Sequence, residues 1–239
     1  MPKLLLFRPV KSSLGQAWIS TPLENHYDPK TSGGKSVISQ FFGESNLCVK
    51  DGQYAYKTNL RCPAGFVDLY NSLGLVGHNG IDLPTKLGEP IFASHDGIVN
   101  AVQSDQKFGN GIELVSREPF DYGSEQAFYK SRYWHLQSVV VKVGDKVDIG
   151  DLLGYADATG ITTGGATGGN HLHFDLKPIQ KQNGVWVNLE TKNGMLGAID
   201  PLPYIIEKDA ITYKQELLNI QNVLNKIAEI IKTLFSFFK

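Results

Sequence analysis

Three short segments of the chain place histidines and an aspartate where they could do chemistry. The segment HLHF puts His171 and His173 two positions apart, and strand residues at that spacing point to the same face. Leu172 and Phe174 then face the other way, into a core. Two imidazoles side by side on an apolar support are typical of half a metal site, although an exposed pair can also arise by chance.

The segment GHNGIDL places His78 four residues before Asp82. This spacing resembles a helical ligand pair, but Gly77 and Gly80 oppose a helix and favour a strand with a turn. A bend at the second glycine can aim both side chains at one point, and a histidine with a carboxylate is a partial zinc set. Alone, the segment is better explained by a plain turn.

The segment SRYWHLQS predicts a strand. Strict alternation puts Tyr133 and His135 on one face, with Trp134 and Leu136 on the other. A lone histidine in an aromatic strand is more often structural than functional, so this segment gains weight only beside the other two.

Two further histidines lack such a setting. His95 lies in ASHDG, which predicts an exposed turn, and neither His95 nor His26 is expected to have a function.

Together, the three segments indicate a catalytic metal. His78, Asp82 and His173 would supply two nitrogens and one oxygen to a tetrahedral ion, which leaves the fourth position for water, as in catalytic zinc sites. His135 and His171 remain nearby without a ligand role. One can accept a proton from the attacking water, and either can stabilise an oxyanion or protonate a leaving amine. The predicted chemistry is metal-assisted amide hydrolysis.

The elements that must position these residues are short and β-rich. Residues 38–205 alternate strand-like runs with turns, and the chain holds 25 glycines, which favours an antiparallel β-sandwich or partly open barrel with a substrate groove. Residues 1–37 are expected to form an N-terminal extension, with one strand near Ala17–Ser20. Residues 206–239 are expected to form a C-terminal amphipathic α-helix.

The helix prediction depends on apolar residues that recur at steps of three and four. They are Leu217, Ile220, Leu224, Ile227, Ile231, Leu234 and Phe238. This is a heptad stripe, although three heptads are marginal for a free coiled coil. The helix is expected to pack on the domain, to associate with another copy, or to touch a membrane surface. Lys226, Glu229 and Lys232 oppose burial as a spanning segment.

Composition restricts the partners and the setting. The 239-residue chain has a formal net charge of −1, so no global field draws it to nucleic acid. The apolar run Leu4–Phe7 is too short for a secretory signal, and no stretch predicts a transmembrane helix. Cys48 and Cys62 cannot form a four-sulfur zinc site, and both a disulfide and two free thiols stay open.

The ordered motifs resemble the M23 peptidases, the lysostaphin and LytM-like endopeptidases of peptidoglycan. The motifs are H-x-x-x-D, Y-x-H-L and H-L-H-F-[DE], in that order. The connecting text agrees: GHNGIDLPTKLGEPIFASHDGIV resembles the first block of the family, and VVVKVGDKVDIGDLLGYADATG resembles its later hairpin. ISQFFGESN, at 38–46, resembles the opening strand that often lies upstream.

By this resemblance, His78, Asp82 and His173 bind one Zn²⁺ per chain, and His135 and His171 are catalytic. The fold is an antiparallel β structure whose groove carries the metal. The implied function is a zinc-dependent endopeptidase that hydrolyses amide bonds in peptidoglycan cross-links or stem peptides, through a metal-activated water. Such a protein acts on the cell wall, either outside the cytoplasm or as a virion-associated lysin.

The chain departs from the family pattern at three places. An insertion at about 47–66 carries both cysteines and could line one end of the groove. The segment TGGN, Thr167 to Asn170, is one residue longer than the usual lead-in to HLH. The common glutamate after HLHF is Asp175 here, which is either a partner that holds His173 from behind or an ordinary strand acid.

Two other functions compete with an active peptidase. The first is a catalytically idle M23-like binding or regulatory module that activates another cell-wall hydrolase. Such relatives lose a ligand or a catalytic histidine, whereas all five polar positions are retained here. The second is a carrier domain, because VKVGDKVDIGDLLGY resembles lipoyl and biotinyl hairpins. No lysine stands at the required hairpin apex, and the histidines would stay unexplained.

Overall fold

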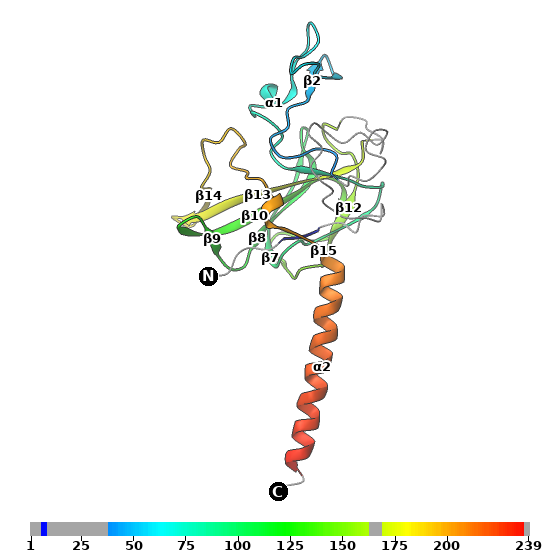
Figure 1. The fold of residues 1–239 in the computed structure, drawn as a ribbon, viewed down its shortest axis with the longest axis vertical. Helices are drawn as coiled ribbons and strands as arrows, with labels where there is room; N and C mark the ends of the chain where they lie inside the picture. The colour runs from blue at the N-terminus through cyan, green and yellow to red at the C-terminus, as the bar shows by residue number, and fades with distance from the viewer. Residues whose placement is uncertain (1–5, 9–37, 163–168, 237–239) are drawn as a thin grey trace.

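The molecule is a mainly β body with one long C-terminal helix, as the sequence predicts (Figure 1). The computed structural model describes residues 6–8, 38–162 and 169–236. The strands are β1 (Leu6–Arg8), β2 (Leu47–Lys50), β3 (Gln53–Tyr56), β4 (Val67–Asp68), β5 (Ile81–Pro84), β6 (Pro90–Phe92), β7 (Gly97–Asp105), β8 (Gly109–Ser116), β9 (Phe120–Tyr122), β10 (Glu125–Val139), β11 (Lys146–Val147), β12 (Leu152–Ala156), β13 (His171–Gln182), β14 (Val185–Asn188) and β15 (Ile205–Asp209). The helices are α1 (Leu69–Ser72), the 3₁₀ turn η1 (Leu202–Tyr204) and α2 (Ala210–Ser236).

The central sheet is antiparallel, and its long strand β10 organises it. β10 pairs with β8 and β13 along most of its length and with β12 near its end. β13 in turn pairs with β5, in a register that sets His173 opposite Asp82. Segments about 90 residues apart in the chain are thereby brought onto adjacent strands.

Alternation along β13 separates the core from the site. Leu172 and Phe174 are fully buried in the main apolar core, together with Ile81 and Leu83 of β5, so the prediction that they face a core is confirmed. The residues between and after them, including His173, belong to the other face of the strand. The apolar packing beneath β13 therefore fixes the direction of the histidines above it.

The N-terminal segment contributes a strand to the body. β1 pairs in parallel with β15, and Leu6 is fully buried in the main core. The strand expected near Ala17–Ser20 lies outside the described residues. The prediction of an opening strand at 38–46 is wrong, because this segment pairs with β5 only through an isolated bridge between Gln40 and Asp82. The Ser39 N–H donates to the Asp82 carbonyl, and the Asp82 N–H donates to that of Gln40, each at 2.9 Å.

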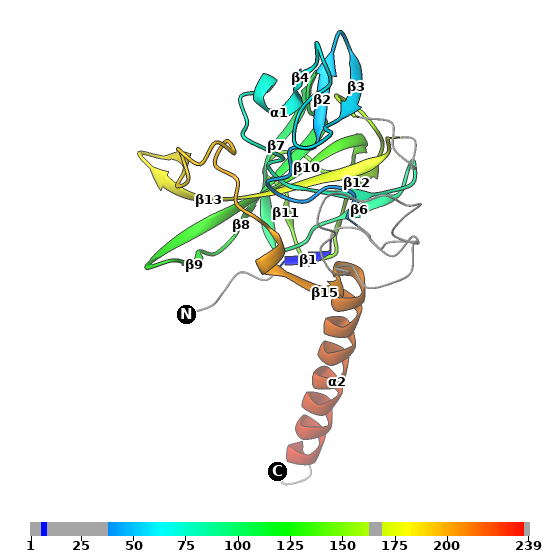
Figure 2. The same cartoon turned by 45° about the horizontal axis from the view of Figure 1, so that its top comes forward.

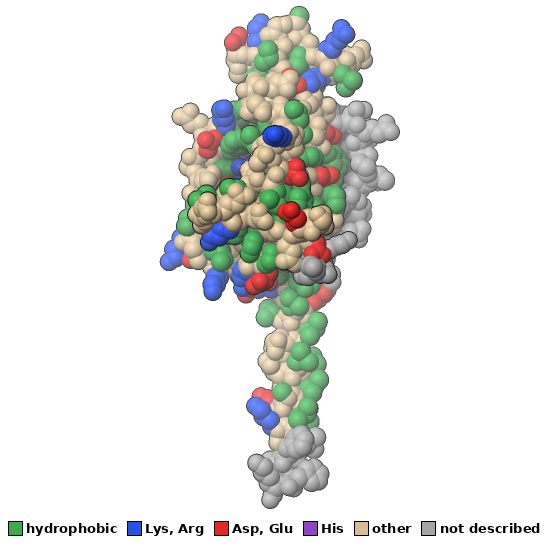
Figure 3. Space-filling view, turned by 90° about the vertical axis from the view of Figure 1, so that its left-hand side faces the viewer, with side chains coloured by type: hydrophobic (Ala, Val, Ile, Leu, Met, Phe, Trp, Pro, Cys, Tyr) green, Lys and Arg blue, Asp and Glu red, His purple; other side chains and the backbone are tan. Residues whose placement is uncertain are grey.

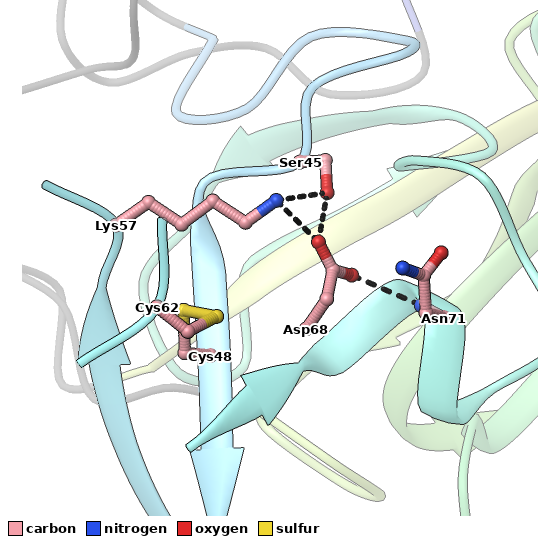
Figure 4. Close-up of a disulfide and its surroundings, with 6 residues drawn as sticks. All are labelled: Ser45, Cys48, Lys57, Cys62, Asp68 and Asn71. Atoms are coloured by element: carbon pink, nitrogen blue, oxygen red, sulfur yellow. Dashed lines mark hydrogen bonds and ion pairs between the residues drawn. A yellow bond between two sulfur atoms is a disulfide. The ribbon is translucent and has the colours of Figure 1, made fainter. Parts of the chain in front are cut away.

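The insertion folds into a small sheet of its own, with strand order β3-β2-β4, at the end of the molecule opposite α2 (Figure 2). Cys48 and Cys62 form a disulfide across it, so the open question about the two thiols is answered (Figure 4). Lys57 forms an ion pair with Asp68 at the end of β4, and Asp68 also caps α1 by accepting from the Asn71 backbone N–H. The disulfide and the ion pair hold a segment that has little apolar core.

Helix α2 extends away from the body (Figures 1 and 2). Its first turns contact the body through an ion pair between Lys214 and Asp151 and through packing of Tyr213 near Ile149. Beyond these turns the apolar stripe is exposed, so of the three alternatives for the helix, packing on the domain holds only for its first turns. In the described part of the chain, no helix is long and apolar enough to span a membrane.

Candidate metal centre and catalytic site

Three elements bring His78, Asp82 and His173 together. His78 lies in the turn before β5, Asp82 lies on β5, and His173 faces Asp82 from β13. His78 Nε2 lies 2.9 Å from His173 Nδ1 and 3.1 Å from Asp82 Oδ1, and His173 Nδ1 lies 3.0 Å from the same oxygen. All three side chains are buried. The three atoms form a triangle slightly smaller than the ligand spacing of about 3.3 Å around a tetrahedral zinc ion.

A glycine at position 80 makes this approach possible. A Cβ on Gly80 would lie 2.6 Å from the Phe174 carbonyl oxygen and 2.8 Å from His173 Nε2. Both distances are shorter than any side chain tolerates, so the turn between His78 and Asp82 can reach β13 only without a side chain. The Asn-Gly pair in GHNGIDL therefore has a packing reason beside its turn propensity.

Hydrogen bonds orient both imidazoles toward the centre. His78 Nδ1 lies 3.2 Å from the Phe41 carbonyl oxygen, to which it donates, and this leaves the Nε2 lone pair facing inward. His173 turns Nδ1 inward, while its Nε2 lies 3.6 Å from Asp175 Oδ2. Two nitrogen lone pairs and the Asp82 carboxylate thus converge on one point. Such a set repels itself unless a proton or a cation lies among the three groups.

The electrostatics of the cluster favour a positive charge. Burial lowers the pKa of His173, but the carboxylates of Asp175 and Asp82 outweigh burial and raise this pKa to about 9. Burial raises the pKa of Asp82, yet the surrounding histidines hold it well below its usual range. The pKa of His78 is lowered, chiefly by burial. The pocket therefore suits a cation, and a divalent metal would replace the proton on His173.

Asp175 lies behind His173 and is itself held by an arginine. Arg132 Nε donates to both carboxylate oxygens of Asp175 at 2.8 Å, and Asp175 is fully buried. Burial raises the pKa of Asp175, but Arg132 and His173 hold it well below its usual range. Of the two interpretations left open for this acid, the geometry supports a partner of His173, because a carboxylate behind a ligating imidazole fixes its orientation.

His135 and His171 stand beside the cluster with matching orientations. His135 Nδ1 donates to the Thr159 carbonyl oxygen at 2.6 Å, and His171 Nδ1 donates to that of Gly169 at 2.8 Å. Each ring is thereby left with an Nε2 lone pair, and the two ring centroids are 4.5 Å apart. His171 Nε2 lies 3.5 Å from Asp82 Oδ2. Burial, reinforced by the neighbouring histidines, lowers the pKa of His135 to about 3, so this ring is neutral at physiological pH.

His135 reaches the site through an irregularity in β10. Its φ of 65° lies in the left-handed region, and the ladder to β8 shifts register between Tyr133 and Leu136. Strict alternation was therefore the wrong expectation: Tyr133 lies in the core with Leu136, where its hydroxyl is bonded to Ser94 Oγ at 2.7 Å. The bulge turns His135 from the core side to the metal side.

The five residues share one pocket with an apolar wall. The lining residues are Gln40, Leu47, Leu69, Tyr70, Leu73, Leu75, His78, Asn79, Asp82, Lys107, Phe108, His135, Ile161, Thr162, His171 and His173. Leu47 begins the insertion, and four further wall residues follow it, in α1 and just after it. The longer lead-in to HLH falls partly on residues 163–168, which lie outside the described part of the chain.

Some features of the site were not predicted. His95 is buried rather than exposed, with Nε2 2.8 Å from Ser131 Oγ, and it lies away from the metal cluster. The support that Arg132 gives Asp175 was missed. A signal existed, because a charged residue in each of two apolar strands suggests a buried pair. The carbonyl oxygens of Thr159 and Gly169, which accept from His135 and His171, could not be predicted because they are backbone atoms.

Comparisons with known proteins agree with the motifs. Residues 76–189 match the family described as Peptidase family M23. The peptidoglycan DD-endopeptidase ShyB of Vibrio cholerae is 34% identical over 102 residues, which are 43% of this chain and 21% of that protein. Lysostaphin of Staphylococcus simulans is 34% identical over 136 residues, covering 56% and 22%. The glycyl-glycine endopeptidase ALE-1 of Staphylococcus capitis is 31% identical over 136 residues, covering 56% and 31%.

The match is to a part of these relatives, since the chain spans between 21% and 31% of their length. Among solved structures, the catalytic domain of lysostaphin from Staphylococcus simulans aligns with a TM-score of 0.40 at 24% identity, covering 54% of this chain and 78% of that one. The family match covers all five site residues, including the three of the metal cluster. The chain therefore contains an M23 peptidase domain and is a relative of peptidoglycan endopeptidases.

Proposed function

We propose that the protein is a zinc-dependent endopeptidase that hydrolyses amide bonds in peptidoglycan cross-links or stem peptides. The observation that carries this proposal is the convergence of three ligand atoms from His78, Asp82 and His173, within 3.1 Å of one another, beside two further imidazoles. One zinc ion per chain would be held by these three residues. Bound there, zinc would lower the pKa of a water molecule toward 7 and polarise the scissile carbonyl.

The chain's own residues divide the remaining work. His135 and His171 each direct Nδ1–H to a backbone carbonyl, which fixes the tautomer and leaves Nε2 able to accept a proton. One of them takes the proton of the attacking water, and either can stabilise the oxyanion as an imidazolium or protonate the leaving amine. Asp175 holds His173 in the orientation that presents Nδ1.

The substrate class follows from the relatives and from the setting of the pocket. Relatives named as a DD-endopeptidase and as a glycyl-glycine endopeptidase match this chain to similar extents, so both kinds of peptide bond stay candidates. A glycine bridge has no side chains that could pack against the apolar wall, which extends from Leu47 to Leu75. We therefore favour a peptide with at least one aliphatic side chain next to the scissile bond.

The alternative is a catalytically idle M23-like module that activates another hydrolase. It is less well supported, because a binding module has no need of two histidines oriented by backbone carbonyls beside a converging ligand set. In either case the protein would act on the cell wall, outside the cytoplasm or as part of a virion. The peptidase domain is proposed to comprise 38–205, with 1–37 as an extension, 47–66 as an insertion and 206–239 as a helical appendage.

Digestion of purified sacculi tests the activity and the choice of bond together. Sacculi with direct, glycine and alanine-containing cross-links are incubated with the protein, and mass spectrometry identifies the released fragments. We expect fragments from at least one chemotype, with a preference for alanine-containing bridges or stems over pentaglycine. Release of no fragments by zinc-loaded protein, but enhanced lysis when a second hydrolase is added, would instead support the idle module.

A further inference from the structure

Helix α2 presents an apolar face that contacts nothing in the described structure beyond its first turns. Ile220, Val223 and Leu224 are each more than half exposed, at 56%, 56% and 52%. Ile227, Ile230 and Ile231 continue the same side of the helix and are also exposed. Figure 3 shows this stripe along one side of the helix as it leaves the body. A soluble helix rarely leaves so continuous an apolar face in water.

The stripe follows a heptad register. With Leu217 at position a, the a and d positions are occupied by Leu217, Ile220, Leu224, Ile227 and Ile231. Val223 and Ile230 then take both g positions, which widens the stripe to three residues per heptad. The e positions hold Gln221, Ala228 and Phe235, none of which carries a charge.

Charges are confined to the opposite side of the helix. Between Leu217 and Ser236 the charged residues are Lys226, Glu229 and Lys232, at positions c, f and b. The uncharged residues on that side are mostly polar, and they are Asn219, Asn222, Asn225, Thr233 and Ser236, with Leu218 as the exception. A helix that lies on an anionic membrane carries many lysines and arginines on its polar face, and this helix has two lysines and one glutamate there. The distribution of charge favours a protein partner with the same apolar face.

We propose that α2 associates with α2 of other copies of this chain through its a, d and g positions, in a bundle of more than two helices. The first two heptads have leucine at a and isoleucine at d, a combination that shifts parallel coiled coils from dimers toward trimers and tetramers. Apolar g positions agree with this, because residues flanking the a/d seam become buried when three or four helices meet. The helix has 27 residues, about 40 Å of length, which is enough for such a seam beyond the body.

The body leaves this face free for assembly. The contacts that orient α2 lie at its start, where Tyr213, Lys214 and Leu217 line a cleft with Arg117 and Ile149. No described residue of the body reaches Leu224 or Ile227, whose side chains are about half exposed. If the proposed peptidase function holds, a bundle would also present several catalytic domains to one polymeric substrate and raise its effective affinity.

The test compares two double variants of the full chain that add the same charge. Leu224→Lys/Ile227→Lys introduces lysines at a and d, whereas Asn222→Lys/Asn225→Lys introduces them at f and b. Light scattering after size exclusion, at about 100 µM chain, gives the mass of each. We expect three or four chains for the wild type and for the Asn variant, and one chain for the Leu/Ile variant, with unchanged thermal unfolding of the β body in all three.

Other outcomes would overturn the proposal. A monomeric wild type at this concentration would do so, and so would equal masses for the two variants. A wild type that is monomeric but sediments with vesicles of phosphatidylglycerol and phosphatidylcholine, and loses this binding in the Leu/Ile variant, would show the stripe to be a membrane-surface helix. A stable dimer would contradict the bundle of more than two helices. None of these results depends on peptidase activity, so they are independent of the proposed function.

Discussion

Tyr133 and His135 lie two residues apart on β10 yet face opposite sides of the sheet. Tyr133 is fully buried in the core, while the ring of His135 lies 4.5 Å from that of His171 in the candidate site. The bulge at His135, with φ of 65°, produces this reversal. A non-glycine residue in the left-handed region is strained by about 1 kcal/mol, so the site is built at a cost to stability.

The strain at His135 predicts an unusual order of variant stabilities. His135→Gly should unfold at a higher denaturant concentration than His135→Ala, by about 1 kcal/mol in unfolding free energy, because glycine adopts positive φ without a Cβ penalty. Both variants should keep zinc and lose turnover by about 10²–10⁴-fold, the usual weight of a general acid or base. Urea unfolding of the zinc-loaded variants measures the first effect. An alanine variant at least as stable as the glycine variant would contradict the strain.

Zinc binding should depend on pH in the direction set by His173. The carboxylates of Asp175 and Asp82 raise the pKa of His173 to about 9, so without metal this imidazole is protonated at pH 6–8. Zinc must displace that proton, and its affinity should therefore rise about tenfold per pH unit from pH 6 to 8 and level off above pH 9. Competition with a chelator of known pH dependence measures this slope. A flat profile over this range would mean that His173 is neutral without metal.

The carboxylate behind His173 should affect metal affinity more than a comparable buried acid. Asp175→Asn is expected to weaken zinc binding by about 10–100-fold, because the amide cannot fix the imidazole as the carboxylate does. Glu113→Gln is the matched control, since Glu113 is also buried on this sheet but pairs with Lys130 rather than with a ligand. Equal zinc affinity in both variants, by the same competition assay, would assign Asp175 a structural role only.

The disulfide should stabilise the insertion and leave the metal cluster intact. Cys48 and Cys62 close a loop of about 15 residues, for which a native disulfide contributes about 3 kcal/mol. Cys48→Ser/Cys62→Ser should make residues 51–61 the first site of limited proteolysis, while zinc content stays unchanged. If the variant protein instead loses zinc, the small sheet supports the metal centre as well as the wall of the pocket.

The metal face of β13 was predictable because its alternation is regular. Leu172 and Phe174 pack into a continuous core, and their neighbours must then point to the site. The predicted amphipathic helix is likewise present, because its period is long and uninterrupted. Short-range patterns were therefore sufficient to predict the fold class and the direction of His173.

Long-range contacts and backbone irregularities limited the rest. No local pattern indicates the bulge at His135, which depends on how β10 changes partners from β13 to β12. His95 follows the pattern of an exposed turn, but it is buried and hydrogen-bonded to Ser131, 36 residues later in the chain. The opening strand failed for a similar reason, since 38–46 pairs with β5 only at Gln40.

The metal content and activity of three matched proteins test directly whether His78, Asp82 and His173 hold a catalytic zinc ion. Wild type, Asp82→Asn and His135→Ala are reconstituted with zinc, dialysed and assayed for metal and for release of peptides from sacculi. We expect about one zinc per chain with activity for the wild type, loss of both for Asp82→Asn, and zinc without activity for His135→Ala. A wild type that binds no zinc, or an Asp82→Asn variant that retains both zinc and activity, would contradict this expectation.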